Sequence, residues 1–412
     1  MKVDLFFFLF SLSSYHMNGG GLCGVKRDID NFFRKELKLP EKLAQFTDIR
    51  KHPVIDLKDI IVQIFLMPFY GVTSLLGIDR ISRKKYFKKL FRCKRKMVSS
   101  DSTIKRVLNW LDETESKSFL SSMLTFMEEH NLLTKRLTEG SEERRIGIFD
   151  GSVMGGHYHE TFSLAGKISY PVMVENCGKR GKELPTAYKM IDEGRALLGR
   201  YFPDLILADS LYFNSNFFDK VREGDSHILI KSADPAFRNV LMDAKLEFDH
   251  KDFFHSDIRD ESGFDLERMC SYKIETASEN FAGYPVLVSH LTEFYPKRKK
   301  EQNSESWIIT TDLSLLPNEI REAAHFRWQI ENNVFKRISH FAGTKKFYCK
   351  NNIAFFNLLR IFFAAIAVFD AFLTLIKENT NKFEKIRCGI KPTWKNMFSI
   401  FGEYFGTGIF RY

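Results

Sequence analysis

The sequence predicts an α/β protein whose mixed β-sheet carries a β-rich insertion and is preceded by a mostly helical N-terminal region. Three observations indicate this fold class. Apolar residues recur at helical spacing through roughly the first 140 residues. Short β-prone runs then alternate with helical stretches, the order typical of an α/β domain. Strand-like runs separated by charged loops follow and predict the insertion.

In the helical region, STIKRVLNWL (102–111) and FLSSMLTFMEEHNLL (119–133) show helical spacing, and Asp101 or Ser102 is placed to cap the first helix. Residues 80–96 contain ten basic residues and no acid. Such a run is suited to phosphate contacts, although a solvated basic face explains the same pattern. The side chains predicted to bind DNA here are Arg83, Lys84, Lys85, Lys88, Lys89, Arg92, Lys94 and Arg95.

The α/β part begins with RRIGIFD, a short β-prone run that ends in an acid. The predicted strands are 144–150, 157–164, 167–175, 204–210 and 226–233, with helices at 183–202 and 214–223. Further strands are predicted at 268–277, 285–294 and 306–313. A helix from Pro317 carries HFRWQIENNVFKRISH, and the apolar helix 351–377 closes the core.

These textures divide the chain into six predicted segments. They are an uncertain N-terminal segment (1–25), a helical, basic region suited to DNA phosphates (26–140), the first part of the α/β domain (141–245), the β-rich insertion (246–305), the second part of the α/β domain (306–380) and a C-terminal tail (381–412).

Composition limits the class of partner and the compartment. The chain has 62 Lys and Arg against 52 Asp and Glu, a net charge of +10, which favours a polyanionic partner. The six cysteines show no CxxC pair, which favours a reducing compartment. The apolar run 5–12 has an acid before it and no clear cleavage site after it, and Arg360 and Asp370 interrupt the run 353–376. We therefore expect no membrane partner.

Two of the acids follow hydrophobic strands. Asp150 and Asp209 each end such a run, and Glu331 lies on the later helix one turn after Arg327. Carboxylates converging from these elements would hold two hard divalent cations, which prefer oxygen ligands. Taken singly, however, an Asp at a strand end is more often a turn or helix cap, and Arg327 with Glu331 matches an ordinary helical ion pair.

Three blocks, IGIFDGS, LILADSLYFN and RWQIENNVFK, resemble the catalytic blocks of insertion-sequence DDE transposases of the IS-four-like group. The resemblance spans about residues 101–372 and implies an RNase H-like catalytic domain with two Mg²⁺ or Mn²⁺ ions. It implies that Asp150, Asp209 and Glu331 are the catalytic metal ligands and that Arg327 lies near the transposon-end phosphate.

The same resemblance implies cut-and-paste movement of the element that encodes the protein. The partners would be double-stranded DNA, both transposon ends and target, and a second copy of the chain. The compartment would be the nucleoid-associated cytoplasm of a bacterial type of cell.

The chain departs from the family signature at two places. Ala324 stands where a tyrosine is common, and Ile338 and Ser339 stand where a lysine is expected. Lys336 and Arg337 are close but offset, and we expect them to reach the DNA backbone. Two alternatives stay open, a nuclease on the same scaffold and a catalytically weakened copy that binds DNA ends.

Four other features were weighed. The HxHE run 157–160 offers two histidines on one strand face, although surface strand histidines are common. Trp328 is expected in the core, with base stacking as the alternative. The basic runs GKRGK (178–182) and PKRKK (296–300) are suited to DNA phosphates or are solvated loops. Neither a G-x-x-x-x-G-K-[ST] loop nor a G-x-S-x-G elbow occurs, which argues against nucleotide-binding loops and serine hydrolases.

Overall fold

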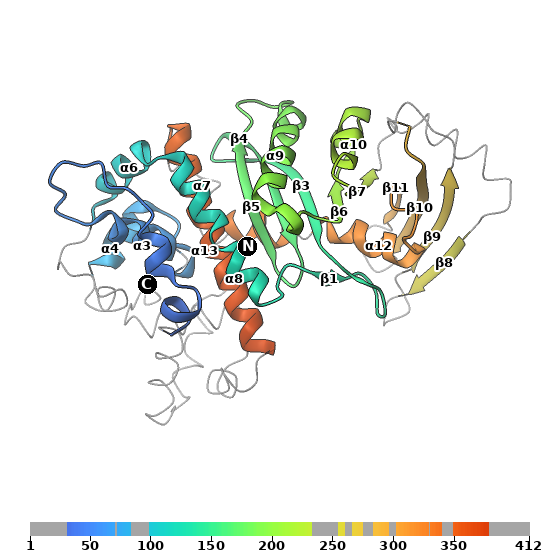
Figure 1. Ribbon diagram of the computed structural model, residues 1–412, viewed down its shortest axis with the longest axis horizontal. Coiled ribbons are helices and arrows are strands. Elements are labelled where there is room, and N and C mark those ends of the chain that lie inside the picture. The colour runs from blue at the N-terminus through green and yellow to red at the C-terminus, as the bar shows by residue number, and fades with distance from the viewer. Residues whose placement is uncertain are drawn as a thin grey trace, which may run out of the picture. The chain divides into compact units, whose positions relative to one another are not determined.

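A computed structural model describes residues 31–70, 72–83, 99–232, 254–259, 266–274, 283–295, 302–328, 330–339 and 349–378. The chain forms two compact units. The helical unit comprises 1–132, 154–156 and 336–412, and the sheet unit comprises 133–153 and 157–335. Figure 1 shows the elements of both. The limits of the six predicted segments remain predictions.

The helical unit is built around one long apolar helix, α13 (Asn352–Glu378). It packs against α3, α6, α7 and the 3₁₀ turn η2. Clustered aromatic rings fill this core, with the Phe32 and Phe372 centroids 4.6 Å apart and those of Phe69 and Phe369 5.0 Å apart. The remaining elements are η1 (Phe32–Glu36), α2 (Leu39–Leu43), α3 (Leu57–Leu66), η2 (Pro68–Tyr70), α4 (Leu75–Ser82), α6 (Asp101–Trp110), α7 (Glu113–Ser121) and α8 (Leu124–Glu129).

Among the described residues, α13 holds the one segment, Asn352–Leu375, that is long and apolar enough to span a membrane. Its apolar window is 89% buried inside the protein, as in the core helix of a soluble protein. Its buried polar residues are satisfied locally. Asn357 donates to the carbonyls of Leu108 and Leu111, and Arg360 donates to Glu113 and Ser116. These bonds explain how a polar side chain is retained in an apolar helix.

The first predicted helices needed two corrections. Ser100 caps α6, because its Oγ accepts a hydrogen bond from the Thr103 amide, whereas Asp101 or Ser102 was expected. The predicted helix 119–133 is not continuous. α7 ends at Ser121 and α8 begins at Leu124, although the apolar spacing runs through the break.

The sheet unit contains a nine-stranded sheet with the order β5-β4-β3-β6-β7-β11-β10-β9-β8. β3 and β6 are parallel, as are β6 and β7, whereas the pairs β7–β11, β11–β10, β10–β9 and β9–β8 are antiparallel. The strands are β3 (Ile146–Met154), β4 (His157–Ala165), β5 (Ser169–Asn176), β6 (Leu205–Ala208), β7 (His227–Ser232), β8 (Phe254–Arg259), β9 (Leu266–Ile274), β10 (Val286–Tyr295) and β11 (Gln302–Thr310).

Helices cover this sheet and connect its strands. α9 (Glu183–Leu198) packs on β4 and β5, α10 (Ser215–Arg222) packs on α9 and β7, and α12 (Pro317–Phe326) packs on β7 to β10. A short hairpin, β1 (Lys135–Arg136) and β2 (Glu143–Arg144), precedes the sheet. The 3₁₀ turns are η3 (Gly199–Tyr201) and η4 (Ser210–Tyr212). The predicted α/β class with a mixed sheet is therefore confirmed.

The predicted β-rich insertion contributes β8, β9 and β10 to the same sheet as the core strands. β8 was not predicted, because its sequence FHSDIR is too polar to read as a buried strand. The predicted helix from Pro317 was also too long. α12 ends at Phe326, and the chain continues as a π-helix, η7 (Ile330–Phe335).

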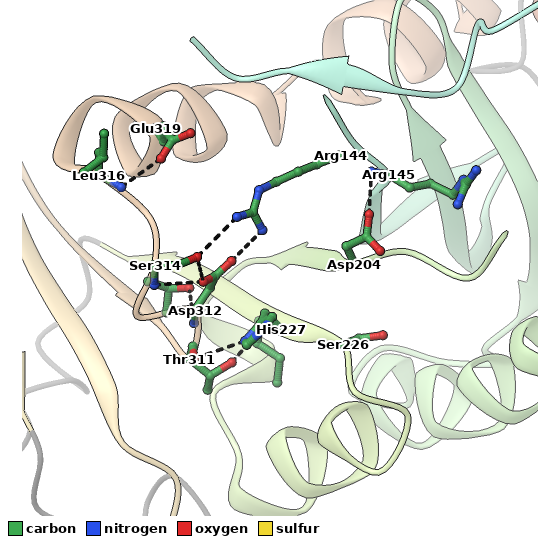
Figure 2. A network of polar contacts seen from close by, with 12 residues as sticks. Arg144, Arg145, Asp204, Ser226, His227, Thr311, Asp312, Ser314, Leu316 and Glu319 are labelled. Atoms are coloured by element: carbon green, nitrogen blue, oxygen red, sulfur yellow. Dashed lines mark hydrogen bonds and ion pairs between the residues drawn. The ribbon is translucent and has the colours of Figure 1, made fainter. Parts of the chain in front are cut away.

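A buried polar network fixes the edge of the sheet where β7 begins and β11 ends (Figure 2). The Arg144 guanidinium lies 2.6 Å from the Asp312 carboxylate, and Ser314 donates to the same carboxylate. Burial raises the pKa of Asp312, but the Ser314 hydrogen bonds and the Arg144 charge outweigh it, so the pKa lies below its usual value. The His227 ring contacts the Thr311 carbonyl at 3.1 Å.

Asn357→Leu should destabilise the protein by about 1–3 kcal/mol, because the carbonyls at the end of α6 lose their buried donor. Urea unfolding followed by circular dichroism would measure this. Ser118→Ala, which removes an exposed hydroxyl on α7, is the control and should shift stability by less than about 0.5 kcal/mol. Equal stability of Asn357→Leu and the control would show that these hydrogen bonds do not hold α13 in place.

Candidate active site

The parallel register of β3 and β6 brings the first two predicted acids to the same level. Ile146 pairs with Leu205 and Ile148 with Leu207, and Asp150 and Asp209 each lie two residues beyond the last pair. β6 ends at Ala208, so Asp209 lies at the open edge of the sheet. Asp150 was expected to end its strand, but β3 continues to Met154. Asp150 lies beyond the end of the neighbouring parallel strand β6, although its own strand β3 continues.

Asp209 also has an ordinary structural role. It is the N-cap of η4, and its Oδ1 accepts a hydrogen bond of 2.8 Å from the Leu211 amide. The prediction that a lone Asp here caps a turn is therefore confirmed. The cap fixes the orientation of the carboxylate and occupies one of its two oxygens.

The break between α12 and η7 places the third acid and its arginine. Arg327 is the C-cap residue of α12, and its Nη1 lies 3.9 Å from Asp150 Oδ1. Glu331 lies in the first turn of η7 and is exposed. Its charge, like that of Asp209, acts on Asp150. The three predicted acids and Arg327 therefore belong to one electrostatic cluster.

The cluster changes the protonation of Asp150. Burial raises its pKa to about 7, the Arg327 charge opposes that rise, and the charges of Asp209 and Glu331 add to it. A carboxylate held against like charges in a partly buried position is destabilised in its ionised form. A cation bound beside it would relieve this repulsion, which is the electrostatic environment expected of a cation site.

Two further carboxyl groups, Glu160 and Glu183, lie beside Gly151, directly after Asp150. A Cβ at Gly151 would come within 2.9 Å of Glu183 Cγ and 3.2 Å of Glu160 Oε2. Glycine is therefore required at this position for the start of α9 to approach β3 so closely. Both oxygens of Glu160 and one of Glu183 are fully buried. Sequence analysis missed both residues as parts of the site.

Glu160 is a buried acid whose pKa is raised, so that its neutral form is favoured. Burial raises its pKa well above the usual value, the neighbouring Tyr212 hydroxyl opposes the rise, and the charges of Asp150, Asp209 and Glu183 add to it. Tyr212 belongs to η4, the turn that Asp209 caps. The Glu160–Tyr212 contact therefore connects β4 to the turn that carries the second catalytic candidate.

The HxHE run contributes through its glutamate and not through its histidines. His159 and Glu160 are consecutive in β4, so they point to opposite faces of the sheet. His159 is fully buried with its ring 5.5 Å from that of Phe335, and burial lowers its pKa to about 3. The signal that could have identified Glu160 was an acid inside an otherwise buried strand.

The donor chemistry of the cluster suits a hard divalent cation, since all its acids offer carboxylate oxygens. The distances between these acids fit a metal ion less well. Within the ranges that the structure describes, no three His, Cys, Asp or Glu side chains are grouped closely enough to hold one metal ion. The exposed Glu331 side chain would have to turn toward Asp150 to close such a group.

The predicted DNA contacts fall in several places. Arg83 is exposed and pairs with Asp79 at 2.8 Å. Arg337 pairs with Asp370 of α13, so its charge is already partnered in the helical unit. Lys336 is exposed in the same unit. The other predicted basic residues, Lys84, Lys85, Lys88, Lys89, Arg92, Lys94 and Arg95, lie outside the described residues, as does the PKRKK run.

Trp328 does not lie in the core, so that expectation was wrong. It is 51% exposed. The Lys231 ammonium lies 5.7 Å from the centre of its ring. Lys231 follows Ile230, which pairs with Ala208 across β6 and β7, so it is level with Asp209. An exposed aromatic ring and a lysine therefore flank the acids.

No protein-family model matches the chain, and a search of curated proteins finds no match. The functional argument therefore rests on the residues and geometry of the site.

Metal-free protein should lose stability as pH rises from 5 to 8. The folded-state pKa of Asp150, about 7, lies above its unfolded value, so its contribution is complete below the unfolded pKa and lost as pH rises through 7. We expect a loss on the order of 1–4 kcal/mol from this residue. Urea unfolding in EDTA would measure it.

Asp150→Asn should flatten this pH dependence, because the amide does not titrate. Asp225→Asn is the matched control, since Asp225 is exposed with a φ of 58° that Asn also tolerates. A pH profile of Asp150→Asn identical to that of the control would contradict the raised pKa.

Proposed function

We propose that this protein is a DNA transposase of the DDE type. It would cleave phosphodiesters at the ends of its own insertion element and join the 3′ ends to target DNA. The observation that supports the proposal is that Arg327 lies 3.9 Å from Asp150 and that the charges of Asp209 and Glu331, acids distant in sequence, both act on Asp150. The sequence resemblance assigns the same four residues to one catalytic site.

The topology supports an RNase H-like assignment of the catalytic core. The first five strands of the main sheet lie in the order β5-β4-β3-β6-β7, so the first of them in sequence is central and has a parallel neighbour. Acids that leave neighbouring parallel strands at their carboxyl edge commonly form an active site in open α/β sheets.

Each residue has a distinct role in the proposed reaction. Asp150, Asp209 and Glu331 would hold two Mg²⁺ or Mn²⁺ ions, which when bound supply charge stabilisation for in-line displacement at phosphorus. Arg327 neutralises part of the acidic cluster and would contact the phosphate at the transposon end. Glu160, next to Tyr212 of η4, would help to hold this turn, and with it Asp209, in position.

DNA at this site would meet Trp328 and Lys231 beside the acids. An exposed indole offers a stacking surface for an unpaired base. The proposed partners are therefore double-stranded DNA, as transposon ends and as target, and a second copy of the chain. The proposed compartment is the bacterial cytoplasm.

Two alternatives share this site. A nuclease on the same scaffold would cut without joining strands, and a weakened copy would bind ends without cutting. The departures at Ala324 and at Ile338 and Ser339 favour the second of these. The assay described next separates all three.

Purified protein should cut a DNA fragment that carries the ends flanking its gene, only with Mg²⁺ or Mn²⁺, and join them to a target plasmid. Asp150→Ala, Asp209→Ala and Glu331→Ala should each reduce cleavage at least ~100-fold while DNA binding persists. Gel analysis of end-labelled DNA would measure both steps. Cleavage without joining would indicate the nuclease, and binding without cleavage the weakened copy.

Trp328→Ala should weaken binding to ends that carry an unpaired base by roughly 5- to 100-fold, because one stacking contact is lost. Trp328→Phe should recover part of that affinity, and fully paired duplex should bind all three proteins alike. Fluorescence anisotropy would provide these constants. Equal affinities of wild type and Trp328→Ala for the unpaired ends would remove Trp328 from the DNA contact.

A further inference from the structure

The connection between β5 and α9, residues 178–182, is an exposed basic turn with the sequence GKRGK. Lys179, Arg180 and Lys182 carry three positive charges within it. In the described parts of the chain none of the three makes an ion pair or side-chain hydrogen bond, in contrast to Lys189 and Lys220 nearby, which pair with acids. The three cations are therefore available to a ligand.

The backbone of this basic turn has a defined shape. Gly178 and Gly181 have φ values of 72° and 81°, which side chains other than glycine rarely adopt. Asn176 Oδ1 accepts a hydrogen bond of 2.8 Å from the Gly178 amide. Thr186 Oγ1 donates to the Lys182 carbonyl at 2.8 Å. Two glycines and a hydrogen bond at each end therefore define the backbone that carries the three basic side chains.

The basic turn lies next to the acidic site. Lys182 directly precedes Glu183, and the Glu183 side chain packs where a Cβ of Gly151 would be, one residue after Asp150. The turn is thus joined by one peptide bond to a residue in contact with the catalytic strand.

We propose that the basic turn binds backbone phosphates of DNA beside the bond that is cut. The proposal rests on the proposed function and adds an element of substrate binding to it. The site itself gathers the acids Asp150, Asp209, Glu331 and Glu183, which repel a phosphate backbone. Exposed unpaired cations at the rim offset this repulsion without contributing sequence preference.

The test compares wild type with the triple variant Lys179→Gln, Arg180→Gln and Lys182→Gln. Lys182 makes no side-chain cap bond to α9, so the changes remove charge and not a helix cap. The matched control is Arg200→Gln in η3, past the other end of the same 16-residue helix, roughly 24 Å away at about 1.5 Å per residue. The affinity of each protein for duplex DNA that contains the element ends is measured at several salt concentrations. Cleavage of this DNA by each protein is measured in parallel.

The triple variant should bind duplex roughly 10- to 100-fold more weakly at low salt. Its slope of log affinity against log salt should be shallower by about 1–3, as expected for the loss of up to three phosphate contacts. The Arg200→Gln protein should match wild type in both its affinity for duplex and its salt dependence. Thermal unfolding of the variants should be unchanged, because all the altered side chains are exposed.

The outcomes separate the two proposals. Cleavage by wild type with unchanged binding and slope in the triple variant would overturn the role of the basic turn and leave the transposase standing. If the wild-type protein binds DNA but never cleaves it, and the triple variant binds more weakly, the result would support DNA binding by the basic turn and reject the proposed enzymatic activity. A wild type that binds no DNA would overturn both.

Discussion

The proximity of the carboxylates around Asp150 is the constraint on which the site depends. Burial is the main cause that raises the pKa of Asp150 to about 7, the Arg327 charge opposes the rise, and the like charges of Asp209 and Glu331 add to it. Three features of the fold set this arrangement. The β3–β6 register sets two acids level, glycine at 151 lets α9 approach, and the break after α12 places Arg327 against Asp150. A carboxyl group with a strongly shifted pKa beside charged partners is typical of functional sites, and the proposed function assigns this one to cation binding.

Much of the fold could be predicted because its strands are short apolar runs bounded by turn residues. The strands β3, β4, β5, β6 and β7, and the helices α9 and α10, lie where the hydrophobic patterns indicated. Boundaries were predicted less well. The helix from Pro317 carries a continuous helical pattern, yet it breaks at Arg327 and resumes as a π-helix. The spacing of apolar residues predicts that the segment is helical, but it does not predict where an α-helix ends and a π-helix begins.

The candidate site could be predicted only in part from the sequence. Asp150, Asp209 and Glu331 were recognisable from local blocks of sequence. Glu160 and Glu183 were not, because their importance arises only from the approach of β4 and α9 to Gly151. Trp328 was expected in the core because large aromatic residues beside a helix are usually buried. The structure instead leaves it 51% exposed, which the sequence pattern does not show.

Mn²⁺ binding, measured by electron paramagnetic resonance of the free ion, is the most direct test of whether the acidic cluster binds divalent cations. The wild-type protein should bind Mn²⁺, with two ions expected per site, and Mg²⁺ should compete. The double variant Asp150→Asn and Asp209→Asn should bind none at this site. Equal Mn²⁺ binding by wild type and the double variant would contradict the account, because the cluster would then be an acidic site without a metal.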